Sequence, residues 1–345
     1  MRIFSYRNKR TIKIGLLVLA GIAALFAILW ICRFVYLQRF LVYSDGQVSL
    51  NYDQDLQRDQ HKAAPLDPED FPIRVTTPEE GAAVSGPVDD SAKQLAGYYI
   101  TTNMLRDIPS VQAALDSLET RPRTVLFEMK SIFGNFYYDS DLFGQYAANA
   151  DIEAIETLIS TLKAQDVYLI AKVPAFSDNN FALDNQSCGL PLSFGALWMD
   201  DAGCYWLDPM DEQVLNFLTA VAAELQKLGF DEILFDGYTI PDSTRIVYPK
   251  EYTREEYAAQ SAQLLKEALA DLPVRVSFGS GSSLLAGIGD RLYLSGVEGS
   301  NVASAAAPLS EGLEDPAAQL VFLTPSRDTR FEDYSVLRPL VETEE

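Results

Sequence analysis

The residues after Ala96 alternate between short runs rich in β-branched and aromatic residues and longer amphipathic segments, and this alternation restricts the chain to few folds. Seven runs are predicted to be strands: residues 97–102, 124–130, 167–176, 232–239, 274–280, 291–297 and 319–325. The segments between them, such as 152–163, 211–228 and 254–271, have helical periodicity. Strands that alternate with helices predict a parallel sheet covered by helices.

Two architectures have this alternation, a doubly wound open sheet and a TIM-type (β/α) barrel. The barrel is favoured because no Gly-x-Gly-x-x-Gly turn follows the first run and because polar residues recur at or just beyond the ends of the runs. These residues are Thr102, Lys130, Lys172, Asp236, Ser280 and Glu298. After Pro325 about 20 residues remain, and their segment FEDYSVLRPLVE looks helical. We therefore expect an α/β barrel with seven recognisable strands, either incomplete or closed by an element that the pattern does not reveal.

The segment LGFDEILFDGYTIP, residues 228–241, contains the most informative strand end. A helix is expected to stop at Gly229, and the apolar run 232–235 is followed at once by Asp236. Ligands bind at the carboxyl ends of the strands in α/β folds. Asp236 is therefore the leading candidate for a functional residue, while Asp231 and Glu232 begin the strand on the side that serves stability.

The composition narrows the possible chemistry. The only histidine, His61, lies in a polar segment before the predicted barrel, which excludes Ser-His-Asp and Cys-His catalysis and histidine-bound zinc. No cofactor and no catalytic metal are indicated, and three loop acids (Asp200, Asp201 and Asp208) would bind calcium only if their loop folded back. Carboxylates remain as the main candidates for acid-base work.

The amino-terminal segment predicts a membrane anchor. Residues 14–32 contain no charge, and residues 14–37 are long enough to cross a bilayer. Five basic residues precede the apolar run and two follow it, so residues 1–13 are expected in the cytoplasm and the rest outside a single-pass cell membrane. A cleaved signal peptide is the competing interpretation, but the run exceeds the usual 7 to 15 apolar residues and no small-x-small site follows it.

The rest of the chain divides into three parts. Residues 38–53 contain two alternating segments around Asp45-Gly46 and predict a hairpin near the membrane, residues 54–95 read as an acidic, proline-containing linker, and residues 96–345 form the predicted barrel. From Leu41 onward the chain has 20 basic and 49 acidic residues, a formal charge near −29. This charge argues against nucleic acid and against docking on anionic lipid, and it is compatible with a sugar substrate.

Four sequence blocks resemble a known family. They are FEMK at 127–130, VYLIAKVPAFSD at 167–178, WMDDAGCYWLDP at 198–209 and LGFDEILFDGYTIP at 228–241. In these blocks the chain resembles the bacterial family known as the putative glycosyl hydrolase domain, a group of α/β barrels related in pattern to α-amylase-type enzymes. The resemblance implies a glycoside hydrolase that acts on or binds oligo- or polysaccharide of the cell envelope or the environment.

The chain also departs from that family's pattern. The family usually continues the last block as Asp-Tyr-x-Arg-Phe-Pro, whereas this chain has DGYTIP, with Thr239 in place of the arginine. The fifth run ends in SFGS and the seventh in Thr324-Pro325, so the amylase-type acids after those strands are absent. The alternative is therefore a non-catalytic carbohydrate-binding or structural protein of the cell envelope.

Hydrolysis of a glycosidic bond generally requires two carboxyl groups. Asp236 is the expected nucleophile, and the partner acid is sought among Glu128, Asp178, Glu298 and Asp208, with Glu128 preferred as the second catalytic residue. Glu128 should share a face with Lys130, which predicts a charge cluster with Lys172 and Asp236 in the barrel mouth. The alternative for this cluster is a structural ion-pair network. The predicted substrate-binding residues are Lys130, Lys172, Asp178, Trp206, Tyr238 and Glu298.

Aromatic residues are concentrated in the same loops and could line a glycan groove or pack as a small core of their own. They are Phe133, Phe136, Tyr137, Tyr138, Trp198, Tyr205 and Trp206. The loop 177–210 is long enough to be functional or to carry its own structure. It contains Cys188 and Cys204, for which a disulfide and two free thiols both remain open.

Overall fold

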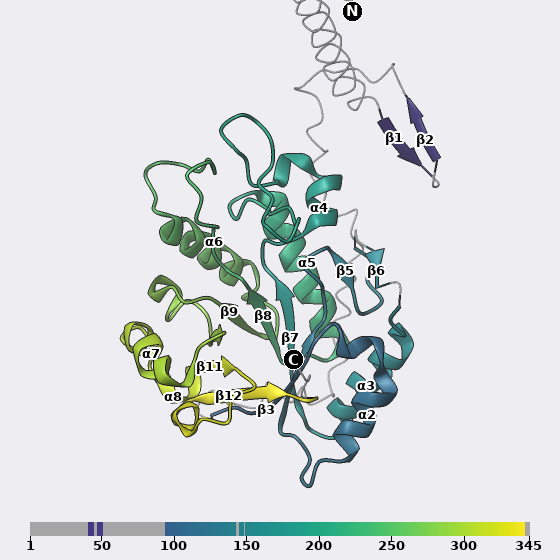
Figure 1. Ribbon diagram of the computed structural model, residues 1–345, viewed down its shortest axis with the longest axis vertical. Coiled ribbons are helices and arrows are strands. Elements are labelled where there is room, and N and C mark those ends of the chain that lie inside the picture. The colour runs from purple at the N-terminus through teal and green to yellow at the C-terminus, as the bar shows by residue number, and fades with distance from the viewer. Residues whose placement is uncertain (1–40, 45–46, 51–93, 143–144, 148, 342–345) are drawn as a thin grey trace, which may run out of the picture. The chain divides into compact units, whose positions relative to one another are not determined.

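The computed structural model describes residues 41–44, 47–50, 94–142, 145–147 and 149–341 (Figure 1). The chain divides into two compact units, Met1–Thr76 and Thr77–Glu345. In the first unit, β1 (Leu41–Ser44) pairs antiparallel with β2 (Gln47–Leu50). The predicted anchor 14–37 and most of the predicted linker 54–95 lie outside the described residues. Among the helices of the described part, none is long and apolar enough to span a bilayer.

The second unit is built on a closed barrel of eight parallel strands. In chain order they are β3 (Ala96–Ile100), β4 (Thr124–Glu128), β7 (Tyr168–Pro174), β8 (Glu232–Asp236), β9 (Arg275–Gly279), β10 (Leu292–Ser295), β11 (Leu320–Leu323) and β12 (Ser335–Pro339). Each strand pairs with the next along the chain, and β12 pairs with β3 to close the ring. The seven predicted strands and the barrel architecture are thereby confirmed.

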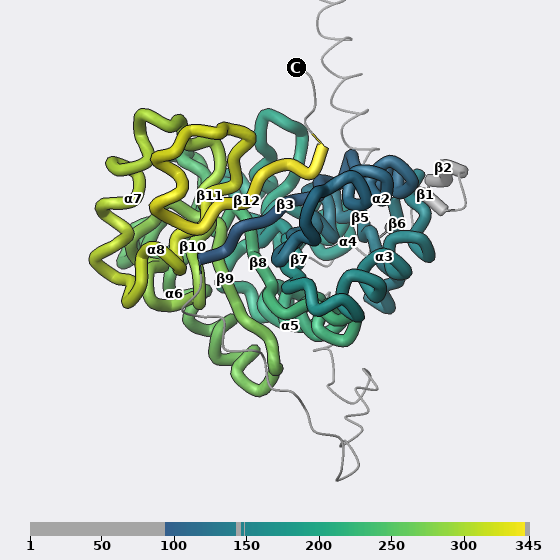
Figure 2. The backbone as a smooth tube through the Cα atoms, turned by 90° about the horizontal axis from the view of Figure 1, so that it is seen from below, coloured from purple at the N-terminus to yellow at the C-terminus, as the bar shows by residue number. Residues whose placement is uncertain are grey.

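The eighth strand corrects the prediction for the end of the chain. Within FEDYSVLRPLVE, a 3-10 turn, η5 (Thr329–Asp333), precedes β12, so the helical prediction was wrong. β12 aligns Val336 with Ala96 and Leu337 with Gly97, and Figure 2 shows β12 running beside β3. The Ser335 hydroxyl accepts the backbone N–H of Leu95 at 2.8 Å, which ties this late strand to the start of the barrel. The barrel is therefore complete.

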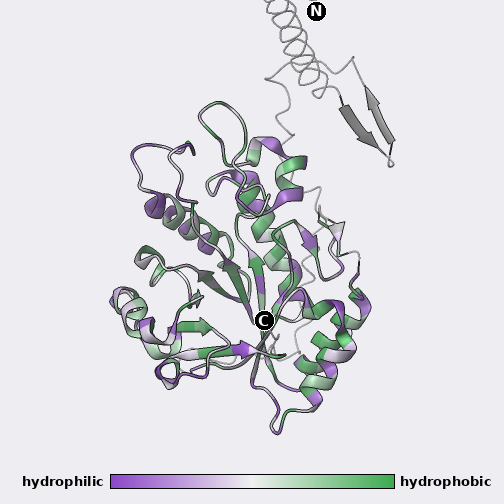
Figure 3. Cartoon of the chain, in the orientation of Figure 1, coloured by the Kyte–Doolittle hydropathy of each residue, from purple (hydrophilic) through white to green (hydrophobic). Residues whose placement is uncertain are grey.

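Helices surround the barrel on its outside (Figures 1 and 3). The α-helices of the described part are α2 (Ile108–Asp116), α3 (Ile152–Ala164), α4 (Asn179–Asp184), α5 (Glu212–Leu228), α6 (Arg254–Ala268), α7 (Val302–Ser310) and α8 (Pro316–Gln319). Shorter elements are the 3-10 turns η1 (Met104–Arg106), η2 (Gln186–Cys188), η3 (Ser283–Leu285) and η4 (Gly299–Asn301) and the strands β5 (Asn135–Phe136) and β6 (Gln145–Tyr146). As predicted, Thr253 and Glu256 form a capping box at α6, and Gly229 ends α5 with φ +111°.

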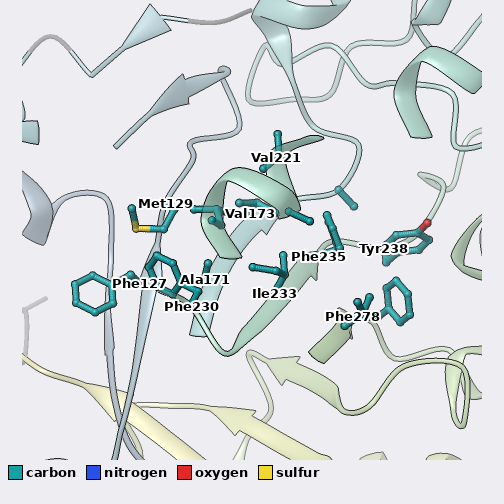
Figure 4. Packing of buried hydrophobic residues seen from close by; sticks show 14 of the residues in the cluster. Phe127, Met129, Ala171, Val173, Val221, Phe230, Ile233, Phe235, Tyr238 and Phe278 are labelled. Carbon is teal, nitrogen blue, oxygen red and sulfur yellow. The ribbon is translucent and has the colours of Figure 1, made fainter. Parts of the chain in front are cut away.

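Two apolar layers and one polar network fill the domain. Outward-facing strand residues pack against the helices, and Figure 4 shows Ile233 and Phe235 of β8 within this layer. Inward-facing residues, including Leu126, Ile170 and Leu234, fill the barrel itself. At its amino end the fully buried Glu232 accepts hydrogen bonds from the side chains of Ser277, Tyr293, Tyr168 and Arg291. This satisfied network seals one end of the barrel, so a ligand has access at the opposite end.

Candidate active site

Three charged side chains meet at the carboxyl end of the barrel. Glu128 is the last residue of β4, Asp236 is the last residue of β8, and Lys172 projects from β7 between them. The strand register produces this arrangement, because Glu128 lies opposite Lys172 and Asp236 lies opposite Pro174. The ammonium of Lys172 contacts Glu128 Oε1 at 3.1 Å and Asp236 Oδ2 at 2.9 Å.

The shared ammonium limits the separation of the two carboxylates. Because contacts of 3.1 and 2.9 Å meet at one nitrogen, Glu128 Oε1 and Asp236 Oδ2 lie no more than 6.0 Å apart. Retaining glycosidases hold their two carboxyl groups about 5 to 5.5 Å apart, whereas inverting enzymes need about 6.5 to 9.5 Å. The separation found here fits the retaining arrangement.

The two carboxylates have different surroundings. Both oxygens of Glu128 are engaged, since Oε2 accepts the backbone N–H of Thr102 at 2.8 Å and Oε1 faces Lys172. Asp236 is 33% exposed, and its Oδ1 accepts no hydrogen bond from the part of the chain that the structure describes. A Cβ atom on Gly279 would lie 2.2 Å from this Oδ1, so the absence of a side chain at the end of β9 makes room for it. Asp236 therefore has one oxygen available to a ligand.

Lys172 is held as a cation. Burial by itself would lower the pKa of Lys172, but the nearby Asp236 and Glu128 carboxylates outweigh burial, and the pKa is raised. Burial also raises the pKa of Tyr99, on the inner face of β3, and the negative charge of Glu128 adds to this effect. Tyr99 is therefore a neutral hydroxyl beside the charged cluster at neutral pH.

The charged residues open into a cavity of about 290 Å³. It is lined by Thr102, Asn103, Arg106, Glu128, Lys130, Ser131, Ile132, Phe133, Asn135, Tyr137, Lys172, Pro174 and Asp236. Phe133 is 42% exposed, so part of its ring is available to a ligand. Of the predicted aromatic set, Phe136, Tyr137 and Tyr138 are instead almost fully buried. A sugar ring could rest its apolar CH face on Phe133 while its hydroxyls reach the charged residues.

The predicted charge cluster is divided into two parts. Lys130 lines the cavity, but its ammonium pairs with Asp178, and both side chains are almost fully buried. Asp178 also caps α4 by accepting the backbone N–H of Phe181, and Lys130 lies near the rings of Phe136 and Phe217. The alternation that would have placed Lys130 beside Glu128 ends with β4 at Glu128. The pair of Lys130 and Asp178 is therefore a structural ion pair beneath the cavity.

Three other predicted binding residues lie away from the cavity lining. Tyr238 is fully buried between the rings of Phe176 and Phe278, as Figure 4 shows for Phe278, and its hydroxyl lies 2.9 Å from Ser261 Oγ. Trp206 is half-buried and donates its Nε1–H to Asp200 at 2.9 Å. Glu298 is exposed before η4. The structure therefore corrects the prediction that these residues bind substrate.

The long loop carries its own structure. Trp198 and Trp206 pack against a small core formed by Leu190, Ile240, Ile246 and Tyr257. Asp208, weighed above as a partner acid, accepts hydrogen bonds from the Tyr257 hydroxyl and the Met210 N–H, and burial raises its pKa. Within the described residues, no group of three or more His, Cys, Asp and Glu side chains is arranged to hold a metal. Asp208 is thus part of the loop core.

Both cysteines of this loop are free thiols, so the disulfide alternative is not formed. Burial raises the pKa of Cys188 and of Cys204 to about 12. The Cys204 thiol donates to the carbonyl of Ile132 at 2.8 Å. Cys204 therefore links the long loop to the segment that carries Phe133.

Sequence reasoning did not select several cavity residues. Arg106 and Asn135 lie in irregular segments after β3 and β4, where no strand period indicates direction. Tyr99 lies within β3 and was assigned only to the strand. Their common signal is position, because each belongs to a strand or loop at the carboxyl end of the barrel.

The chain was compared with known proteins. The family model described as "Putative glycosyl hydrolase domain" matches residues 97–280, which is more than half of the chain and includes Glu128, Lys172 and Asp236. None of the curated proteins matches.

Several solved structures are similar. A cycloisomaltooligosaccharide glucanotransferase from Paenibacillus sp. is 13% identical with a TM-score of 0.50, and the match covers 68% of this chain and 39% of that one. A hypothetical protein from Ruminiclostridium thermocellum is 20% identical with a TM-score of 0.46, covering 52% of this chain and 96% of that one. A variant of the glycoside hydrolase domain of PelA from Pseudomonas aeruginosa is 14% identical with a TM-score of 0.44, covering 72% and 94%.

At such identities structural likeness bears on the fold alone, and the glucanotransferase match agrees with the barrel described above. The family model supplies more, because it spans the first five strands of the barrel and the whole charged cluster at their carboxyl ends. The chain belongs to the putative glycosyl hydrolase domain family.

Proposed function

We propose that this protein is a retaining glycoside hydrolase that acts on oligo- or polysaccharide at the mouth of its barrel. The observation that carries the proposal is the pair formed by Glu128 and Asp236, whose oxygens lie within 6.0 Å of each other beside an open cavity. Membership in the glycosyl hydrolase domain family supports the same chemistry.

In the proposed mechanism Asp236 is the nucleophile, because its Oδ1 is free of hydrogen bonds within the described part of the chain. Oδ1 forms a bond to the anomeric carbon while the bond to the leaving oxygen breaks, and Glu128 gives its proton to that oxygen. Glu128 then takes a proton from water, and the water oxygen displaces Asp236 from the sugar. The configuration at the anomeric carbon is retained after two displacements.

Lys172 has a specific part in this scheme. An acid catalyst must carry a proton, so Glu128 has to exchange its contact with Lys172 for a contact with the leaving oxygen when substrate is bound. Lys172 keeps its 2.9 Å contact with Asp236, which holds the nucleophile in its charged form. This is the part that an arginine at position 239 would have had.

The proposal is tested with the full chain, a panel of oligosaccharides, and the variants Asp236→Asn and Glu128→Gln. We expect both variants to lose most of the hydrolysis of the wild type, whereas Asp271→Asn, an exposed acid far from the cavity lining, retains it. A 2-fluoro glycoside should leave a covalent adduct on Asp236 that mass spectrometry detects, and NMR of the first product should show the retained anomer. Full activity in Asp236→Asn would remove this residue from the mechanism.

One observation favours a second function, carbohydrate binding without hydrolysis. Lys172 contacts both carboxylates at once, and β9 ends in Gly279 rather than an acid. A binding protein would hold a glycan through the same residues and release no product. The two functions separate if the wild type binds an oligosaccharide tightly and gives no product over long incubation, while Asp236→Asn weakens that binding.

We place this activity outside the cell, on a single-pass anchor formed by residues 14–37. The charge-free run 14–32, flanked by basic residues mainly on its amino side, supports this location. The substrates would then be polysaccharides of the cell envelope or the environment, since polymers of that size are met outside the membrane.

A further inference from the structure

We propose that the sugar bound in this cavity carries an anionic group, a carboxylate or a sulfate, which Arg106 recognises. The inference rests on the proposed function in one respect, the occupation of the cavity by a glycan. It adds the substrate class, which neither the acid pair nor the family assigns.

The charges that line the cavity carry the first step. Three cations, Arg106, Lys130 and Lys172, and two acids, Glu128 and Asp236, line it. Lys130 is neutralised by the buried Asp178, and Lys172 is shared by the two acids. Arg106 makes no ion pair and no side-chain hydrogen bond with any residue that the structure describes. A full positive charge therefore remains available to a ligand in this cavity.

The second step is that Arg106 is held at the cavity although acids are abundant. The chain has 49 acidic and 27 basic residues, so an arginine without a nearby carboxylate is unusual here. The adjacent acid, Asp107, accepts hydrogen bonds from the Ser110 N–H and hydroxyl at the start of α2, and these bonds lower its pKa. Leu105 is fully buried and fixes the turn in place. The backbone thus presents Arg106 while its nearest acid serves as a helix cap.

The chemistry of the guanidinium selects the ligand. Arginine binds carboxylate, sulfate or phosphate oxygens in a bidentate geometry, whereas a sugar hydroxyl gains little from a full cation. The net charge of −22 opposes the approach of an anionic chain, but salt screens such repulsion beyond about 8 Å at physiological ionic strength. Within the cavity the nearby cation therefore determines the preference.

The test compares matched pairs of oligosaccharides that differ only in their anionic groups. Oligogalacturonate, oligoalginate and hyaluronan fragments are each paired with their carboxyl-reduced forms, and sulfated chondroitin fragments with desulfated ones. Binding is measured by calorimetry with the full chain, the variants Arg106→Gln and Arg106→Lys, and the control Arg121→Gln, an exposed arginine before β4 at the other end of the barrel.

We expect at least one anionic oligosaccharide to bind about tenfold more tightly than its neutral partner, as one charged hydrogen-bonded pair would provide. Arg106→Gln should abolish this difference without weakening the neutral partner, Arg106→Lys should keep part of it, and Arg121→Gln should match the wild type. If no anionic member of any pair is preferred, or if Arg106→Gln weakens both members equally, the inference is overturned.

The two proposals fail separately. Preference for the anionic member is a binding result and stands or falls whatever the turnover. Unchanged hydrolysis in Asp236→Asn overturns the catalytic proposal whatever the binding preference. The carboxylate and sulfate pairs show which anionic group the site accepts.

Discussion

Lys172 supplies the positive charge that the family's sequence pattern places at position 239, where this chain has Thr239. The charge reaches Asp236 from the neighbouring strand β7 instead of from the loop that follows β8. Because one ammonium also contacts Glu128, the two acids and the lysine form a single unit at the barrel mouth.

The first prediction concerns this shared charge. Lys172→Met should leave two carboxylates within 6.0 Å of each other without a neutralising group, and we expect the free energy of unfolding to fall by about 2 kcal/mol. Urea unfolding followed by circular dichroism measures this change. The matched control is Lys163→Met, which removes an exposed ion pair with Asp231 and should change stability by about 0.5 kcal/mol. Equal effects of the two substitutions would contradict a special position of Lys172.

The second prediction concerns the room left for Asp236. In Gly279→Ala the new Cβ would lie 2.2 Å from Asp236 Oδ1 and 2.9 Å from its Cα, so Asp236 has to shift. A displacement of about 1 Å at a nucleophile lowers a rate by about 100-fold, and we expect this loss in hydrolysis of an oligosaccharide.

The control for this change lies two residues further on. A Cβ on Gly281 would meet no atom within 4 Å, so Gly281→Ala should retain the wild-type rate. If Gly279→Ala has the same activity as Gly281→Ala, the contact with Asp236 has no catalytic meaning. Thermal melts of both variants separate a displaced nucleophile from a misfolded barrel.

The sequence predicted the acid pair and Lys172 because all three lie on strands, where side-chain direction alternates. It misplaced Tyr238 and Lys130, which follow the ends of β8 and β4, because the alternation stops there and packing decides direction. Arg106 was overlooked for the same reason. Local pattern thus reaches the last residue of a strand and no further.

Among the elements, β12 shows the limit of periodicity most directly. Its five residues are too few to distinguish a strand from a helix by pattern, and its partners are β11 and, from the start of the barrel, β3. The seven other barrel strands were predicted because each is followed or preceded by a clear helix or turn signal, such as the Thr253 capping box or Gly229. The closing strand has neither.

The third prediction tests whether β12 is needed. Leu337 is fully buried inside the barrel, so Leu337→Ala should lower the free energy of unfolding by about 2 to 5 kcal/mol through the cavity that it creates. Val341 follows β12 and is 37% exposed, and Val341→Ala should change stability by about 0.5 kcal/mol or less. Chemical unfolding of the two variants compares them. Similar stabilities would mean that the barrel holds together without its eighth strand.

At the scale of the whole molecule, charge is distributed very unevenly along the chain. The first 40 residues contain seven basic and no acidic side chains, and the remainder contains 20 basic and 49 acidic ones. Such a division suits a chain whose start faces anionic lipid from the cytoplasm and whose larger part extends into solvent outside.

The fourth prediction follows from this division. In a bacterial cell the full chain should sediment with membranes and resist extraction by carbonate, and protease added outside should digest the barrel. A variant without residues 14–37 should be recovered from the cytoplasm in soluble form. A cytoplasmic reporter protein controls for lysis. Recovery of the intact full chain in the soluble fraction would contradict the anchor.

The direction of the strands has a consequence for the handling of long substrates. All eight strands of the barrel run the same way, so the chain enters the domain at the amino end of β3, at the rim opposite the acid pair. The attachment point and the working face therefore have opposite polarity. A polymer of any length can pass across the mouth without crossing the protein's own leading segment, which makes internal bonds of a long chain as accessible as its ends.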